Sequence, residues 1–223
     1  MNKIFNTIGV FNITNNLKFD KKYPVILGSS SPRRIELLKE ITRDFKIIKP
    51  NVNEKEILLK SFNDNIKLDF LEDSFISCSE IALAKAKNIY KNNKNSLIIS
   101  ADTIVVTEDK IFGKPKSKED AFLSLKSFLG KFHYIATSVC LFIDENNYDL
   151  FYSVSAVKFV EETKFSLNYI KKYVSSERPM DKAGSYGVQE VGTYLVDSVY
   201  GDYYNIVGFP VVEVRRRIYE NFS

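Results

Sequence analysis

Residues 23–41 read YPVILGSSSPRRIELLKEI, and this order of residue types predicts a strand, a turn and a helix. The strand is expected at residues 23–27, a short apolar run, and the turn at residues 28–31. Apolar residues then recur close to helical spacing, at Ile35, Leu37, Leu38 and Ile41. Ser31 suits the N-cap, and Pro32 suits the first helical position, where its missing N–H costs nothing.

Outward from this unit, the pattern predicts alternating strands and helices. Strands are expected at residues 45–48, 96–106, 110–112, 134–143 and 151–159, and helices at 78–90, 117–129, 167–174 and 212–221. Residues 55–75 have no firm period and are interpreted as irregular or insertion-like. Residues 183–213 are interpreted as turns and strands. Residues 1–22 are polar and rich in Asn and Lys, so we expect an extension outside one α/β domain that spans residues 23–223.

Composition sets broad limits on function. The chain has 223 residues and a net charge of +4, from 32 Lys and Arg against 28 Asp and Glu, which favours small anionic substrates over a nucleic-acid groove. No stretch reaches the roughly 20 apolar residues of a membrane span. Cys78 and Cys140 lack metal-ligand spacing and indicate a reducing compartment. The single histidine, His133, excludes zinc sites that need several imidazoles, and we expect it to be structural.

The serine-rich turn is the first candidate phosphate site. Backbone N–H groups at a helix N-terminus favour an anion, Ser29 and Ser31 add hydroxyls, and Arg33 and Arg34 add planar donors that match phosphate. The alternative is an ordinary capped helix with two surface arginines. The sequence of this turn alone does not decide between them.

Three further segments carry residues suited to nucleotide chemistry. Asp102 stands beside a buried-type strand, where a carboxylate can bind a metal or activate water, or simply cap a turn. Lys114 lies between Gly113 and Pro115 and can point at a phosphate, although this is not a Walker A loop and the tripeptide by itself favours a plain surface turn. Residues 182–192 crowd small residues around Gln189, whose amide can pair with a base edge.

These motifs, taken in order, resemble the Maf family of nucleotide pyrophosphatases. The matching segments are GSSSPRR (28–34), ADTIV (101–105), GKP (113–115), GKFH with Thr137 (130–133, 137), DKAGSYGVQ (181–189) and GDYYNIVGFP (201–210). The resemblance spans roughly residues 25–214. One such motif is weak, but six in the same order are specific.

The resemblance implies a fold, a reaction and a set of roles. The fold is an α/β structure with a long, twisted mixed sheet, flanking helices and two lobes around a deep cleft. The reaction is cleavage of a nucleoside triphosphate to a monophosphate and pyrophosphate with Mg²⁺ or Mn²⁺. The roles fall on Asp102 as proton acceptor, on Glu54 and Asp102 as metal ligands, and on Ser29, Ser31, Arg34, Lys85 and Lys114 as phosphate-binding residues.

Substrate preference within the family is implied by three positions. Members with Arg, Thr and Gln there prefer dTTP and UTP, whereas members with Trp, Gln and Glu are linked to 7-methyl-GTP. This chain has Arg33, Thr103 and Gln189, and therefore resembles the dTTP/UTP branch. The resemblance also implies a homodimer. The cysteines, the short apolar runs and the scattered charges favour a cytoplasmic protein that binds neither nucleic acid stably nor a membrane.

Several residues depart from the family pattern. Asn53 stands where Asp is common, Arg178 where Glu is common, and Ser138 and Glu190 where Gly is common. Three alternatives stay open: a nucleotide-binding regulator of cell division without turnover, a weak nucleic-acid binder, and a relative of the inosine-triphosphate pyrophosphatases. Retention of Glu54, Lys85 and Asp102 favours an enzyme over a regulator.

Overall fold

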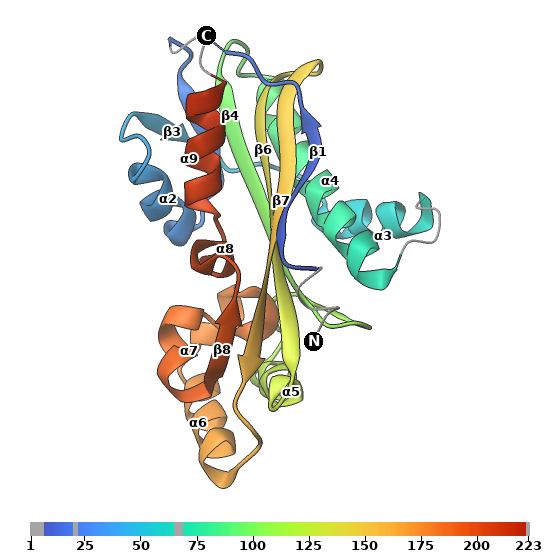
Figure 1. Cartoon of the computed structure of the whole chain (residues 1–223), viewed down its shortest axis with the longest axis vertical. Coiled ribbons are helices and arrows are strands. Elements are labelled where there is room, and N and C mark those ends of the chain that lie inside the picture. The colour runs from blue at the N-terminus through green and yellow to red at the C-terminus, as the bar shows by residue number, and fades with distance from the viewer. Residues whose placement is uncertain (1–6, 20–21, 65–68, 222–223) are drawn as a thin grey trace.

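A long, twisted, mixed β-sheet forms the centre of the molecule, with helices on both faces (Figure 1). The structure, a computed structural model, describes residues 7–19, 22–64 and 69–221. The strand order is β1-β7-β6-β4-β2-β3, with β5 paired to β4 and β8 paired to β7. This arrangement confirms the α/β fold with a long mixed sheet and flanking helices.

The β-hairpin β6–β7 is the longest part of the sheet. β6 (Phe132–Asp144) and β7 (Asn147–Phe159) pair antiparallel almost from end to end, and β4 (Leu97–Val106) pairs antiparallel to β6. Most residues of these three strands are buried, because helices and loops cover both faces. The strands expected at residues 96–106, 134–143 and 151–159 are therefore confirmed, with longer bounds for the last two.

The strand–turn–helix unit at residues 23–41 is also confirmed. β2 (Val25–Gly28) leads through Ser29–Ser31 into α2 (Pro32–Lys39), with Ser31 at the N-cap and Pro32 at the first helical position. β2 pairs parallel to both β4 and β3 (Phe45–Ile47). The carboxyl end of β2 therefore lies beside the middle of β4, where Gly28 is in register with Ser100.

The segment 55–75 is helical, which corrects the irregular interpretation for the described residues. α3 (Glu54–Asp64) and α4 (Phe70–Tyr90) occupy it, so α4 begins eight residues before the helix expected at 78–90. Asp69 caps α4 by accepting a hydrogen bond from Leu71 N at 2.8 Å. The serines inside α4 bond to carbonyls four residues earlier, which satisfies their hydroxyls within the helix. Residues 65–68 of the segment lie outside the described residues.

The N-terminal segment is part of the sheet, contrary to the expectation that residues 1–22 lie outside the fold. β1 (Gly9–Asn15) pairs antiparallel to β7, and Leu17 and Phe19 that follow it are buried. β1 covers an edge of β7 that would otherwise carry unpaired backbone groups. Residues 1–6, 20 and 21 lie outside the described residues, so the expectation for them is not tested.

Two groups of helices cover opposite ends of the sheet (Figure 1). One end carries α2, α3, α4 and α9 (Val211–Glu220), and the other carries α5 (Lys118–Phe128), α6 (Lys164–Ser175) and α7 (Val188–Leu195). Residues 183–213 also hold β8 (Val196–Tyr200) and α8 (Tyr203–Val207), so the expected turns and strands are largely short helices. Within the described residues, no helix combines the length and apolar character needed to cross a bilayer.

Candidate active site

A cleft of about 690 Å³ lies between the two groups of helices. This volume is within the range of small-molecule sites. Its lining includes every residue that the sequence nominated for the site, namely Ser29, Ser31, Arg33, Arg34, Glu54, Lys85, Asp102, Thr103, Lys114 and Gln189. Seven basic and three acidic side chains line the cleft in all, so the cleft favours an anion.

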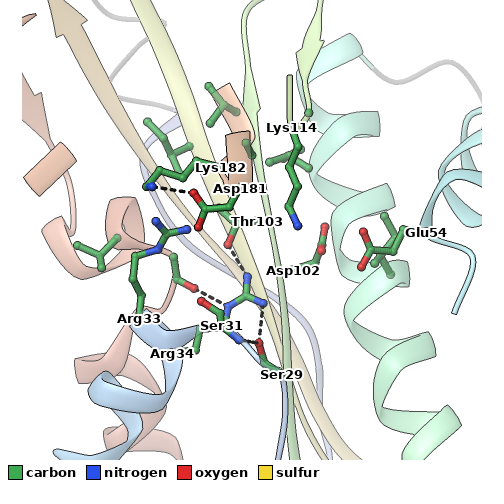
Figure 2. Close-up of a pocket in the computed structure, with 18 of the residues that line it drawn as sticks. Ser29, Ser31, Arg33, Arg34, Glu54, Asp102, Thr103, Lys114, Asp181 and Lys182 are labelled. Atoms are coloured by element: carbon green, nitrogen blue, oxygen red, sulfur yellow. Dashed lines mark hydrogen bonds and ion pairs between the residues drawn. The ribbon is translucent and has the colours of Figure 1, made fainter. Parts of the chain in front are cut away.

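The serine-rich turn forms one wall of the cleft. An added Cβ at Gly28 would come within 2.8 Å of Ile89 Cδ1 in α4, so the Ile89 side chain would have to shift for a larger residue. Ser29 Oγ accepts a hydrogen bond from Ser31 N at 3.2 Å. The Ser31 side chain makes no capping hydrogen bond within the described structure, and Figure 2 shows it at the cleft beside Ser29.

Arg34 reaches from α2 to the floor of the cleft (Figure 2). Its Nε donates to Gly208 O at 2.9 Å, and its Nη1 donates to Ala101 O at 2.8 Å. Its Nη2 donates to Thr103 Oγ1 at 2.8 Å. Burial lowers the pKa of Arg34, an effect that the charge of Asp102 opposes. These acceptors are all uncharged, so the guanidinium is held in place but not neutralised by a direct ion pair among the described residues.

Lys85 joins the two acidic residues of the opposite wall. Its Nζ lies 2.7 Å from Asp102 Oδ1 and 2.7 Å from Glu54 Oε1. The Lys85 side chain is 7% exposed and that of Asp102 12%, whereas Glu54 is 56% exposed at the rim. α4 positions Lys85 because it packs against β4, where Ser100 Oγ donates to Ala82 O at 2.6 Å.

Asp102 lies within β4, inside the strand expected at residues 96–106, so the alternative in which it caps a turn is wrong. Its second oxygen, Oδ2, lies 3.6 Å from Cys78 Sγ, so both oxygens have a donor. Burial raises the pKa of Cys78, and the Asp102 charge raises it further, which keeps the thiol protonated as a donor. Burial also raises the pKa of Glu54, but the attraction of Lys85 and Lys114 outweighs it and the net shift is downward.

Lys114 approaches this acidic pair from the far side of the cleft (Figure 2). It follows β5 (Ile111–Phe112), which pairs with Val105 and Val106 of β4 as the expected hairpin. Gly113 O accepts a hydrogen bond from Gly184 N at 3.2 Å, so the Lys114 turn is tied to the segment 181–187. Two motifs whose bonded residues, Gly113 and Gly184, are 71 positions apart therefore meet at the cleft.

Arg33, Gln189 and two further residues form the remaining wall. Gln189 lies in the first turn of α7 and is exposed, and Arg33 lies near Asp181 (Figure 2). Lys182 is 7% exposed overall, and its Nζ donates to Asp181 Oδ1 at 2.7 Å and to Arg178 O at 2.6 Å. Asp181 and Lys182 belong to the DKAGSYGVQ motif, but the resemblance implied no role for either side chain.

The chemistry of the donor set fits a divalent cation bound together with substrate. The described residues hold no group of three or more His, Cys, Asp or Glu suited to a metal. Mg²⁺, however, is commonly bound by one or two carboxylates plus substrate phosphates. Asp102 and Glu54 meet that requirement. Both carboxylates lie 2.7 Å from Lys85 Nζ, so they are close to each other.

His133 is structural, as expected. It is fully buried in β6, stacks on Phe128 and lies 2.7 Å from Tyr186 Oη through Nε2. Burial lowers its pKa to about 3, so the ring is neutral near pH 7. Cys78 and Cys140 are both buried and free of disulfides.

Comparison with known proteins adds a family to this geometry. A family model described as Maf-like protein matches residues 24–221, nearly the whole chain after β1. A dTTP/UTP pyrophosphatase from Thermosipho africanus (strain TCF52B) is 39% identical over 196 residues, covering 85% of this chain and 89% of that protein.

Two more relatives carry the same name. The dTTP/UTP pyrophosphatase of Dictyoglomus thermophilum (strain ATCC 35947 / DSM 3960 / H-6-12) is 37% identical over 86% of this chain and 93% of its own length. That of Clostridium botulinum (strain Alaska E43 / Type E3) is 36% identical over 88% of this chain and 98% of its own length. The similarity therefore covers almost the full length of each relative.

Proposed function

Because the chain belongs to the Maf-like protein family, we propose that it hydrolyses dTTP and UTP to the nucleoside monophosphate and pyrophosphate. One observation carries the proposal. In a single cleft, a carboxylate pair held by Lys85 faces a serine-rich helix N-terminus and several uncompensated cations. The cations suit a triphosphate, and the carboxylates suit a metal and an attacking water.

Asp102 acts as the general base. One of its oxygens is fixed by Lys85 and the other by Cys78, so the carboxylate is oriented before substrate binds. A water molecule beside Asp102 gives its proton to the carboxylate, and the water oxygen bonds to the α-phosphorus. The bond from that phosphorus to the bridging oxygen breaks, and its electron pair leaves with pyrophosphate.

The basic residues stabilise the leaving pyrophosphate. Lys114 and Arg34 offer N–H donors and positive charge, and Ser29 and Ser31 offer hydroxyls and backbone amides at the start of α2. A divalent cation, Mg²⁺ or Mn²⁺, supplies further charge neutralisation when it is bound by Glu54 and Asp102. Before the cation binds, Lys85 holds these two carboxylates together, because its positive charge reduces their mutual repulsion.

Arg33, Thr103 and Gln189 select the base. All three line the cleft, Arg33 and Gln189 on one wall and Thr103 on the floor. The Gln189 amide can both donate to and accept from a pyrimidine edge. We therefore assign dTTP and UTP, the substrates in the names of the relatives, to this chain as well.

The homodimer, the cytoplasmic location and the lack of stable nucleic-acid or membrane binding form part of the same proposal. They rest on the resemblance and, for the reducing compartment, on two buried free cysteines. The division into an extension (1–22) and one enzymatic domain (23–223) is also proposed, with β1 as a strand that the extension adds to the sheet.

The test is pyrophosphate release from dTTP, UTP, 7-methyl-GTP and ITP, with and without Mg²⁺ or Mn²⁺. We expect metal-dependent release from dTTP and UTP, and a loss of about 10²-fold or more in Asp102→Asn, as the removal of a general base gives. Asp109→Asn is the matched control, because Asp109 is exposed and lies outside the residues that line the cleft.

Three outcomes would count against parts of the proposal. Turnover of Asp102→Asn within a few-fold of wild type would remove Asp102 from the role of base. Turnover confined to 7-methyl-GTP or ITP would keep the reaction and reject the assignment of Arg33, Thr103 and Gln189. Tight nucleotide binding without any turnover would favour the regulator.

A further inference from the structure

Thr103 is the one residue of β4 that is only partly buried. The other nine residues of the strand, from Leu97 to Val106, are all buried. Thr103 lines the floor of the cleft, and its Oγ1 already accepts a hydrogen bond from Arg34 Nη2 at 2.8 Å. The same oxygen lies 3.0 Å from Thr137 Oγ1 in the neighbouring strand β6, where Thr103 and Thr137 are in register.

Thr137 is in turn fixed by Asn205 of α8. Thr137 Oγ1 donates to the backbone oxygen of Asn205 at 3.0 Å, and Thr137 N donates to Asn205 Oδ1 at 3.1 Å. The Asn205 Nδ2 group donates to Ile135 O and to Ser155 Oγ, both at 2.9 Å. These partners determine which way the amide of Asn205 faces, because only its nitrogen can donate to a carbonyl. Asn205 and Thr137 are both fully buried.

The direction of the hydroxyl protons follows from counting donors. Each threonine hydroxyl has one proton. If Thr137 gives its proton to Asn205 O, Thr103 can give its own proton to Thr137 Oγ1, and both hydroxyls are satisfied. In the reverse arrangement, Thr137 donates to Thr103, and the Thr103 proton meets no acceptor among the described residues. The first arrangement makes one more hydrogen bond among the described residues and is therefore favoured.

Thr103 then has one lone pair left, and it faces the cleft. One lone pair of its oxygen receives Arg34, and its proton is directed at Thr137. Gly208 lies beside Thr103, and its φ of +111° disfavours residues other than glycine. A bound molecule therefore meets an acceptor at Thr103 and no donor.

We propose that Thr137 and Asn205 are positioning residues that turn the Thr103 proton away from the cleft, so that Thr103 accepts the ring N3–H of uracil or thymine. This inference rests on the proposed function for its choice of ligand. Cytosine carries an acceptor at N3, so its lone pair faces the lone pair of Thr103. This arrangement favours a pyrimidine with a protonated N3 over cytosine. A phosphate oxygen is also an acceptor, so it cannot form a hydrogen bond with Thr103 in this arrangement.

The experiment compares binding of α,β-imido-UTP and α,β-imido-CTP, which cannot be cleaved at the bond in question, by calorimetry. The variants are wild type, Thr137→Val and Thr137→Ser. Valine removes the acceptor for the Thr103 proton with little change in shape, whereas serine keeps it. We expect the Kd for the CTP analogue divided by the Kd for the UTP analogue to fall about tenfold in Thr137→Val, because one hydrogen bond contributes about that factor. Thr137→Ser should retain the wild-type ratio.

The ratio of two Kd values measured on one sample does not depend on the fraction of protein that is folded. A general loss of packing weakens both ligands together and leaves the ratio unchanged. An unchanged ratio in Thr137→Val, or an equal fall in Thr137→Ser, overturns the inference. Turnover of UTP by the same wild-type sample is measured in parallel. A shifted ratio without turnover rejects the proposed reaction alone, and turnover without a shifted ratio rejects the positioning role alone.

Discussion

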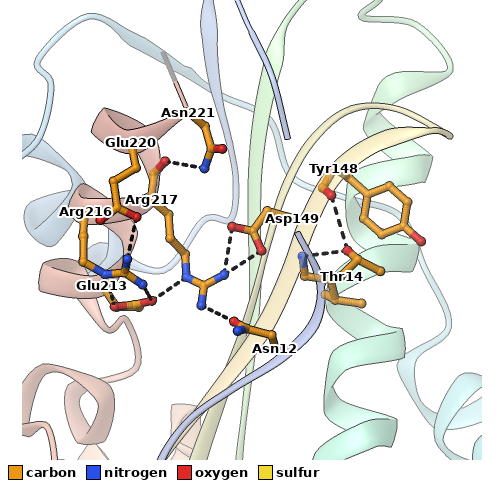
Figure 3. Close-up of polar contacts among 10 residues, drawn as sticks. Asn12, Thr14, Tyr148, Asp149, Glu213, Arg216, Arg217, Glu220 and Asn221 are labelled. Atoms are coloured by element: carbon orange, nitrogen blue, oxygen red, sulfur yellow. Dashed lines mark hydrogen bonds and ion pairs between the residues drawn. The ribbon is translucent and has the colours of Figure 1, made fainter. Parts of the chain in front are cut away.

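Two arginines, Arg217 in the interior and the partly buried Arg34 at the cleft, are held in opposite ways. Arg217 of α9 is 4% exposed and is surrounded by carboxylates (Figure 3). Its Nη1 lies 2.7 Å from Asp149 Oδ1, and it also contacts Glu213 and, through Nη2, the side chain of Asn12. Arg34, at the floor of the cleft, bonds to two backbone carbonyls and a hydroxyl instead.

The difference separates a structural cation from the one that we propose binds phosphate. The charge of Arg217 is cancelled by ion pairs, and the group connects β1, β7 and α9. The charge of Arg34 is left without a direct counter-ion among the described residues, while its geometry is fixed as firmly. A cation held in place but not neutralised retains its attraction for an anion, which is the property that a triphosphate site needs.

Removing the structural cation gives the largest expected effect of the substitutions below. Arg217→Met leaves Asp149 fully buried and without its partner, which we expect to lower the free energy of unfolding by about 3–5 kcal/mol. The measurement is urea unfolding of wild type and variant, with turnover corrected for the folded fraction. Turnover per folded molecule should be unchanged.

The double variant Arg217→Met/Asp149→Leu is the matched control. Replacing both members of a buried pair by apolar residues removes the uncompensated charge, so most of the lost stability should return. A single variant as stable as wild type would contradict the structural role of Arg217. A loss of turnover per folded molecule would contradict the separation of the two arginines.

Removing the functional cation should change activity more than stability. Arg34→Met is expected to lower kcat/KM for UTP by about 10²–10³-fold, the usual effect of losing a donor aimed at developing charge. Arg34→Lys keeps the charge but not the planar fork, and should recover only part of the loss. Steady-state kinetics check both variants, and kcat/KM within a few-fold of wild type in Arg34→Met would remove Arg34 from phosphate binding.

The two arginines should also differ in their response to acid. Burial raises the pKa of Glu213, but its contacts with Arg216 and Arg217 outweigh this effect and lower the pKa below its usual value of 4.5. The groups that bond to Arg34 do not titrate. A carboxylate with a depressed folded pKa stabilises the fold above its unfolded pKa and loses this contribution as pH falls through the folded value. The Glu213 contribution is therefore complete above pH 4.5 and is lost below it.

Unfolding of Glu213→Gln at several pH values tests this expectation. The stability gap between wild type and variant should be less than about 1 kcal/mol, because Glu213 lies near the surface, and it should close as pH falls below 4.5. A gap that grows toward acid pH would reverse the sign and contradict the ion-pair role.

Local patterns in the sequence predicted the parts of the site that are built from neighbouring residues. The strand, turn and helix around Gly28–Ser31 follow from apolar spacing and from the Ser31 N-cap, and the structure confirms them. The α4 start was missed although a capping signal was present, with Asp69 followed by apolar residues at helical spacing. The polar composition of residues 55–75 concealed it.

Contacts between distant residues could not be predicted in the same way. Thr137 and Asn205 are 68 residues apart, and Arg217 and Asn12 are 205 apart. Their pairing depends on the register of β6 and on the placement of β1, neither of which leaves a local pattern in the sequence. β1 was missed because its Asn-rich sequence resembles an extended tail, while its stability comes from the edge of β7.

Product analysis shows whether the cleft cleaves a nucleoside triphosphate between its α- and β-phosphates, as we propose. UTP is incubated with the protein and a divalent cation, and the products are identified by phosphorus NMR and anion-exchange chromatography. We predict UMP and pyrophosphate in equal amounts, with neither formed by Asp102→Asn at a comparable rate. UDP and inorganic phosphate as the products, or intact UTP beside a protein that binds it, would contradict the account.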